Sequence, residues 1–157
     1  MTEAALTSEL VEAIAVAGER EQGAARAAAA IRRFGAYRWV GLYDVNADEI
    51  AVVAWDGPAA PAHPRFPRSQ GLCGAAVAAG AAVIVGEVAA DTRYLTTHAT
   101  TRSEIVVPVF AGGGVAGLID VESERTQAFG ADDQQLLERC AALIAPLWRG
   151  RQDEVGD

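Results

Sequence analysis

The chain has 157 residues, of which 51% are hydrophobic and only 6% aromatic, and its formal net charge is −8. This length suits one domain with a single sizeable core. The negative charge argues against binding to nucleic acids and to anionic membrane surfaces, since both repel an acidic protein. The sequence has neither an apolar run of the roughly 20 residues needed to span a membrane nor a recognisable signal peptide, so we expect a cytoplasmic protein.

The first 36 residues are predicted to form helices. Apolar residues recur at helical spacing near the N-terminus, and residues 22–34 are rich in alanine, which favours helix. Residues 37–45 and 50–55 then show the alternation of strands, joined by a turn-like segment, and are predicted to form a hairpin.

A proline-rich loop follows at residues 57–70, with Pro58, Pro61, Pro64 and Pro67 spaced three apart. That spacing matches a polyproline II helix, which has three residues per turn. The favoured interpretation is a stiff covering loop. The alternative is a ligand for a partner with an aromatic groove.

The second half of the chain alternates short elements with turns. A short helix is predicted over 71–79 and a brief strand over 82–85, followed by a loop at 91–101. Residues 104–110 and 115–123 are predicted strands joined by a glycine turn.

The closing helix is predicted over residues 132–148, within a C-terminal segment of 130–149. Its apolar residues recur every three or four positions, and Pro146 is expected to bend or end it.

These elements predict a single α+β domain over residues 1–150, with the sheet and pocket loops in 37–129 and a tail at 151–157. The expected architecture is a central antiparallel sheet of about five or six strands. The N- and C-terminal helices cover one face, and a ligand pocket lies under loops on the other.

Three segments resemble the free methionine-(R)-sulfoxide reductase branch of the GAF domains: Gly-Leu-Cys-Gly at 71–74, Arg-Ser-Glu-Ile-Val-Val-Pro at 102–108, and Gly-Leu-Ile-Asp-Val-Glu-Ser at 117–123. In that branch, reduction uses three cysteines. The resemblance places His63, Cys73 and Thr97 at the three positions, with Thr97 at that of the reactive cysteine. A threonine hydroxyl cannot form the sulfenic acid that sulfoxide reduction requires, so the resemblance implies a scaffold without its redox chemistry.

Cys73 leaves two alternatives open. Near a helix N-terminus it could form a thiolate and act with an external thiol, or it could be a small buried residue. The only other cysteine, Cys140, lies on the apolar face of the closing helix and is expected to be buried.

The resemblance also assigns ligand-binding roles to acidic residues, at Glu104, Asp120 and Glu122 in this sequence. Asp120 and Glu122 are two apart on a strand and therefore face the same side. Three converging acids would attract an ammonium group and raise one another's pKa values, unless they merely form a solvated strand face.

Trp39 and Tyr43 match an aromatic pair that walls the ligand in the resembled family, and core packing is the alternative. His63 and His98 are expected to flank the pocket mouth near Cys73. The sequence contains no CxxC or HExxH motif, so no metal and no cofactor is expected. The minor alternative is a transition metal held by imidazole, thiolate and carboxylate groups near Cys73.

Three functions remain open. The favoured one is a domain that binds a small amino-acid-like or cationic ligand without turning it over. The second is an active free methionine-(R)-sulfoxide reductase that uses Cys73. The third is a dimerising module with a vestigial pocket. A homodimer is expected through the terminal helices, with Leu6, Leu10 and Ile14 and the face carrying Leu143 and Leu147 as the candidate interface.

Overall fold

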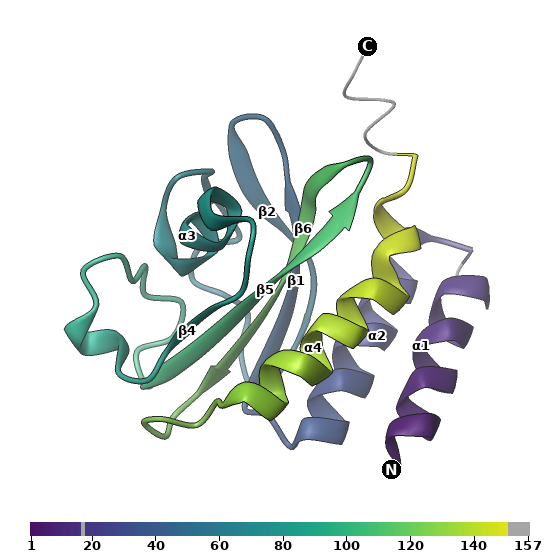
Figure 1. Cartoon of the computed structure of the whole chain (residues 1–157), viewed down its shortest axis with the longest axis horizontal. Helices are drawn as coiled ribbons and strands as arrows, with labels where there is room; N and C mark the ends of the chain where they lie inside the picture. The colour runs from purple at the N-terminus through teal and green to yellow at the C-terminus, as the bar shows by residue number, and fades with distance from the viewer. Residues whose placement is uncertain (17, 151–157) are drawn as a thin grey trace.

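The computed structural model describes residues 1–16 and 18–150, so the predicted tail at 151–157 lies outside the described residues. Six strands form one antiparallel sheet in the order β3-β2-β1-β6-β5-β4 (Figure 1). The predicted α+β fold is confirmed. The elements are α1 Glu3–Val16, α2 Arg20–Gly35, β1 Trp39–Val45, β2 Glu49–Asp56, β3 Arg65–Pro67, α3 Gly71–Ala79, β4 Val83–Val85, η1 Val88–Ala90, β5 Ser103–Ala111, β6 Gly114–Ser123, α4 Ala131–Ile144 and η2 Ala145–Trp148.

One face of the sheet packs against the terminal helices α1, α2 and α4, which lie together on the right in Figure 1. We call it the helix face. Alternate strand residues point into this core, among them Val40 and Leu42 of β1 and Ile119 and Val121 of β6. Successive residues of each strand therefore point to opposite faces of the sheet, as the alternation in the sequence predicted.

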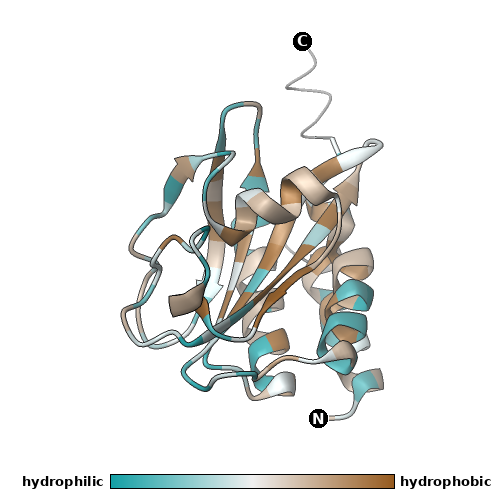
Figure 2. Ribbon diagram, turned by 60° about the vertical axis from the view of Figure 1, so that its left-hand side comes forward, coloured by the Kyte–Doolittle hydropathy of each residue, from teal (hydrophilic) through white to brown (hydrophobic). Residues whose placement is uncertain are grey.

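The opposite face, which we call the pocket face, packs against α3 and the loops on either side of it. Its apolar cluster is smaller and includes Trp39, Tyr43, Leu72, Cys73 and Val106. Figure 2 shows that the strands are mainly hydrophobic, with a few hydrophilic bands inside the sheet.

The proline-rich loop contains a short strand that the sequence analysis missed. Residues 65–67 form β3, which pairs with β2 at the edge of the sheet, where a proline does not interrupt an inner ladder. The backbone N–H of Val52 donates to the carbonyl of Pro64 at 2.8 Å, and that of Ala62 donates to the carbonyl of Thr97 at 3.2 Å. These bonds tie the loop to the sheet and to the segment before β5, as expected of a covering loop.

The closing helix ends as an α-helix at Ile144 and continues as a 3₁₀ turn that contains Pro146. This agrees with the predicted effect of proline, which cannot donate the next helical hydrogen bond. Among the described residues, no helix combines the length and the apolar composition needed to cross a bilayer.

The expected dimer interface needs a correction in its residues. Leu6 and Leu10 are 1% and 0% exposed, because α1 turns them inward onto α2 and the rest of the helix-face core. Leu147 is also buried, at 8%. These side chains already stabilise the single chain, so they cannot form the surface of a dimer; pairing through other residues of the terminal helices stays a prediction.

Candidate functional site

Three acidic side chains gather on the pocket face at one end of β5 and β6. Glu104 of β5 lies directly opposite Glu122 of β6, and Val106 lies opposite Asp120. Paired residues of antiparallel strands share a face, and so do residues two apart on one strand. The carboxyls of Glu104, Asp120 and Glu122 therefore form one row, which we call the acid row. The sequence predicted that Asp120 and Glu122 face the same side, because they are two residues apart on a strand. The pairing of β5 with β6 shows that Glu104 faces that side too.

The row is buried. The exposed fractions of Glu104, Asp120 and Glu122 are 3%, 1% and 1%. No arginine or histidine among residues 1–16 and 18–150 forms an ion pair with any of them. Two of the buried oxygens, Asp120 Oδ1 and Glu122 Oε2, have no hydrogen-bond partner in the part of the chain that the structure describes. Buried acceptors without a donor are rare in folded proteins and ask for an explanation.

This environment changes the acidity of all three groups. Burial, followed by the charges of Asp120 and Glu122, raises the pKa of Glu104 well above its usual value. Burial raises the pKa of Asp120 to about 6, although hydrogen bonds with its two acidic neighbours limit the rise. Burial and the charge of Asp120 raise the pKa of Glu122, while nearby hydroxyl groups oppose that rise. The row therefore holds protons at a pH where ordinary carboxyls have lost them.

The hydroxyl groups around Glu122 come from the segment before β5, and the sequence analysis gave two of them no role. Tyr94 donates from its hydroxyl to Glu122 Oε1 at 3.4 Å. Thr97 and Thr101 also lower the pKa of Glu122 through their hydroxyls. Tyr94 and Thr101 carry no local motif, so only the fold could have placed them here.

The aromatic pair stands beside the acid row on β1. Trp39 lies opposite Glu122 across the β1–β6 ladder, and Gly41 lies opposite Asp120. The rings of Trp39 and Tyr43 are 6.5 Å apart between centroids. A Cβ at Gly41 would overlap the Trp39 ring, so glycine lets this ring fold over the strand next to Asp120. Gly41 was not among the predicted site residues.

Cys73, His63 and Thr97 line a single small cavity, together with Tyr43, Glu104 and Asp120. These six side chains come from six separate parts of the chain. The free volume of this cavity is about 10 Å³, enough for roughly one water molecule. The structure thus brings the three positions of the resemblance to the acid row, but in this conformation it leaves no space for an amino acid.

Cys73 occupies the third position of α3, yet its surroundings disfavour a thiolate. Its pKa is raised well above the usual value, first by burial and then by the charges of Asp120, Glu104 and Glu122. Of the two alternatives that the sequence left open, this environment favours the small buried residue, because burial and three acids oppose the charge that a helix N-terminus would favour. Cys140 is 1% exposed within the helix-face core, as expected.

His98 departs from the expected arrangement. Its ring packs edge-on against Trp39, with centroids 5.1 Å apart, and it lines a different cavity of about 120 Å³ with Pro58 and Ala59. The indole N–H of Trp39 donates to the carbonyl of Ala59 at 3.0 Å. Only His63 of the two histidines shares the cavity of Cys73. The segment carrying His98 turns it toward the indole instead.

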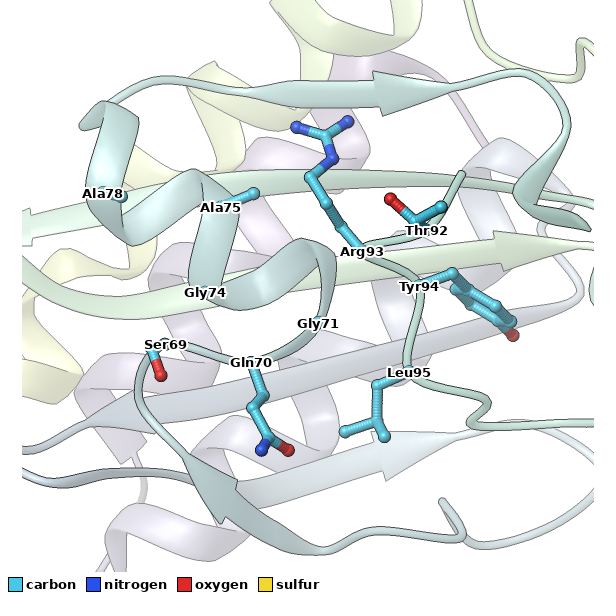
Figure 3. Close-up of a pocket in the computed structure, with 10 residues that line it drawn as sticks. All are labelled: Ser69, Gln70, Gly71, Gly74, Ala75, Ala78, Thr92, Arg93, Tyr94 and Leu95. Atoms are coloured by element: carbon cyan, nitrogen blue, oxygen red, sulfur yellow. The ribbon is translucent and has the colours of Figure 1, made fainter. Parts of the chain in front are cut away.

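An open groove of about 480 Å³ lies on the outside of α3 (Figure 3). One wall is α3, with Gly74, Ala75 and Ala78, and the other is the segment 92–95. The charged residue in its lining, Arg93, donates from Nε and a terminal nitrogen to Asp91 at 2.9 and 2.7 Å. Since that charge is already satisfied, the groove offers no comparable site.

Comparison with known proteins agrees with this geometry. The family model of the GAF domain matches residues 19–146. The chain is 29% identical over 130 residues to GAF domain-containing protein A of Dictyostelium discoideum, covering 81% of each chain. Protein YtsP of Bacillus subtilis is 29% identical and is matched over 65% of its length. The free methionine-R-sulfoxide reductases of Escherichia coli and Saccharomyces cerevisiae are 27% and 30% identical and are matched over 63% and 60% of their lengths.

Two solved structures are also similar. A free methionine-R-sulfoxide reductase from Neisseria meningitidis, solved in complex with its substrate, has a TM-score of 0.85 and 29% identity, covering 98% of this chain and 92% of that one. The type II free methionine-R-sulfoxide reductase from Thermoplasma acidophilum has a TM-score of 0.74 and 31% identity, covering 82% and 94%. The chain therefore belongs to the GAF domain family, and it is homologous to free methionine-R-sulfoxide reductases.

Proposed function

We propose that this GAF domain binds a small molecule with a positively charged amino group, of amino-acid type, and does not reduce it. The observation that carries this proposal is the row of three buried carboxyls, Glu104, Asp120 and Glu122, which has no cationic partner among the described residues. Buried charges in proteins are normally paired. A ligand cation would supply the missing partner.

An ammonium group suits the unsatisfied oxygens. It has three N–H donors and no acceptor, and hydrogen bonds between charged groups are about twice as strong as neutral ones. Asp120 Oδ1 and Glu122 Oε2 are the buried acceptors that lack a donor. Trp39 and Tyr43, on the same face, offer the apolar wall that a thioether or alkyl side chain would contact.

The proposed lack of reduction rests on the chemistry of two side chains. Thr97, at the position that the resemblance gives to the reactive cysteine, lines the cavity but carries a hydroxyl. Cys73 is buried among acids that oppose its thiolate form, which is the nucleophile in sulfoxide reduction. Neither residue supports the attack on sulfur.

Binding of an amino acid requires the covering segments to move apart. The cavity of about 10 Å³ is closed by the proline-rich loop and by the segment before β5, which are joined by the hydrogen bond from Ala62 to Thr97. Opening breaks this bond and separates His63 and Thr97 from the floor of the cavity. The ligand then replaces contacts between loops with contacts to the acid row.

Titration calorimetry with chelator-treated protein tests the binding. Methionine and its sulfoxides are the probes, and we expect at least one to bind, with release of protons because an ammonium favours the ionised carboxyls. Asp120→Asn should weaken this binding at least about tenfold, as expected for the loss of a buried charge-assisted hydrogen bond. Glu124→Gln is the matched control, since this exposed acid pairs with Arg38 instead.

The binding proposal is contradicted if none of these probes produces heat, or if Asp120→Asn binds as tightly as the wild type. Circular dichroism of both variants establishes that each is folded. The proton release is read separately, by repeating the titration in buffers of different ionisation enthalpy.

Turnover is tested by incubation with free methionine-(R)-sulfoxide and a thiol reductant, with methionine measured by chromatography. The wild type should form none. Thr97→Cys, exposed to the sulfoxide without the reductant, should release methionine while its new thiol is oxidised to a sulfenic acid, which a trapping reagent detects. Methionine formation by the wild type that disappears in Cys73→Ser would show instead that the chain is a reductase.

A further inference from the structure

Three potential metal ligands meet at the floor of the small cavity. The sulfur of Cys73 and one carboxylate oxygen each of Glu104 and Asp120 all lie within 4.8 Å of one another. They come from α3, β5 and β6, and their exposed fractions are 5%, 3% and 1%. A contraction of about 1 Å would bring such a trio to the spacing of ligands around one transition-metal ion, where bonds are about 2.0–2.3 Å.

The cavity that these three residues help to line has room for an ion. A volume of about 10 Å³ accommodates one species the size of a water molecule. In the closed conformation a single metal ion therefore meets the ligands without any movement of the covering loops. An amino acid does not.

The charge at this position also calls for a cation. Asp120 Oδ1 lacks a hydrogen-bond partner although its side chain is 1% exposed and lines the cavity. The carboxyls and the thiol repel one another when ionised, and no basic residue of the described chain pairs with them. The positive charge of a divalent ion offsets this repulsion, and a thiol that coordinates the ion gives up its proton.

We propose that Cys73, Glu104 and Asp120 bind a divalent transition-metal ion of the zinc class. Binding forms one metal–sulfur and two metal–oxygen bonds and releases to solvent the thiol proton and any proton held by the two carboxyls; no electrons are transferred. A thiolate with two carboxylates suits a borderline ion such as Zn²⁺, whereas Mg²⁺ and Ca²⁺ take six or more oxygen ligands. Three protein ligands leave a fourth position for water.

This site departs from the expectation that no metal is bound. That expectation relied on the absence of contiguous motifs, and the three ligands here are 31 and 16 residues apart in sequence, from 73 to 104 and from 104 to 120. The proposal is independent of the proposed function, although both occupants use Glu104 and Asp120 and should compete.

Cobalt titration of the chelator-treated full chain tests the proposal. Co²⁺ should bind one to one and produce a thiolate-to-cobalt charge-transfer band in the near ultraviolet, and Zn²⁺ should displace it. Cys73→Ser should abolish that band. Asp120→Asn should weaken Zn²⁺ binding at least about tenfold in a competition assay.

Cys140→Ser is the matched control, because it removes the other buried thiol, which lies in the helix-face core. It should leave the band and the affinity unchanged. A Zn²⁺-dependent rise in melting temperature that is lost in Cys73→Ser gives a second readout in folded protein.

The metal proposal is overturned if Co²⁺ gives no thiolate band at stoichiometric amounts, or if the band persists in Cys73→Ser. Amino-acid binding is measured on metal-free protein, so its outcome does not depend on the cobalt result. Failure of one proposal can therefore be recognised without failure of the other.

Discussion

The two faces of the sheet bury acidic residues in opposite ways. On the side of the terminal helices, Asp44 is 8% exposed and accepts hydrogen bonds from the guanidinium of Arg20, one of them at 3.2 Å. Arg20 also lies over the ring of Trp148, 5.3 Å from its centroid, and donates to the carbonyl of Leu147. On the pocket face, no cation from residues 1–16 or 18–150 pairs with Glu104, Asp120 or Glu122. A buried acid with its own arginine is part of the structure, whereas the buried acids without one are the basis of the proposed ligand site.

The largest expected effect comes from breaking the paired acid. Arg20→Met removes the guanidinium from which Asp44 accepts hydrogen bonds. It should lower the free energy of unfolding by about 2–4 kcal/mol, the cost of removing one partner of a buried ion pair, reduced for partial exposure. Urea denaturation at pH 7.5 measures it. In a double-mutant cycle, Asp44→Asn should recover part of the loss; full additivity of the two changes would mean that the pair does not interact.

The unpaired acids should respond in the opposite direction. In metal-free protein without ligand, Glu104→Gln removes a group that must either hold a proton or repel its neighbours. It should raise the free energy of unfolding at pH 7.5 by about 1–3 kcal/mol, the usual cost of a buried polar group without a hydrogen-bond partner. Glu87→Gln, at an exposed acid paired with Arg102, is the control. Destabilisation by Glu104→Gln in the metal-free protein would contradict the claim that the row is uncompensated.

The pH dependence of stability separates the two faces further. A carboxyl whose pKa is raised by folding stabilises the protein fully below its ordinary pKa, and that stabilisation is lost as the pH rises through the folded value. For Asp120 this window runs from 3.8 to about 6. The metal-free protein should therefore lose about 1–2 kcal/mol of stability between pH 5 and pH 8. Asp91, whose pKa is lowered to about 2 by Arg93, acts only below this range.

Thermal denaturation across pH 5–8 measures this loss, with Asp120→Asn as the comparison. The variant should show a flatter profile. A wild-type profile that rises toward pH 8 would contradict the raised pKa values of the row.

The smallest expected effect concerns the hydroxyl that faces the row. Tyr94→Phe removes the 3.4 Å hydrogen bond to Glu122 and should change the free energy of unfolding by about 0.5–1 kcal/mol or less, because the bond is long. Chemical denaturation measures it, and Tyr37→Phe, which removes the 2.9 Å bond to Asp133 on the other side of the molecule, is the matched control. A larger loss in Tyr94→Phe than in Tyr37→Phe would mean that the row depends on this hydroxyl.

Strand periodicity was enough to predict much of the fold. The alternation along β1 placed Trp39 and Tyr43 on one face and Val40 and Leu42 on the other, and parity put Asp120 beside Glu122. These are local properties, because the side-chain direction of a strand follows from its backbone alone. The short helix over 71–79 was likewise predicted, because Gly80 marks its end in the sequence. In the structure Gly80 has a positive φ of 59°, which favours glycine at a helix end.

The parts that escaped prediction depend on tertiary contacts. The strand β3 forms because β2 offers it an edge, and nothing in Arg65–Pro67 marks it as a strand. The depth of burial that raises the pKa of Cys73 exists only once α3 covers the sheet. The meeting of Cys73 with Glu104 and Asp120 joins three elements, so no spacing along the chain could reveal it.

The hydrogen bond from Ala62 to Thr97 has a kinetic consequence. It joins the two segments that cover the cavity, and the bond from the Trp39 indole to Ala59 anchors one of them nearby. An amino acid can reach the acid row only during the intervals when this closure is released. Its observed association rate should therefore reach a plateau at high concentration, set by the frequency of opening, while a small ion should arrive at a rate that keeps rising.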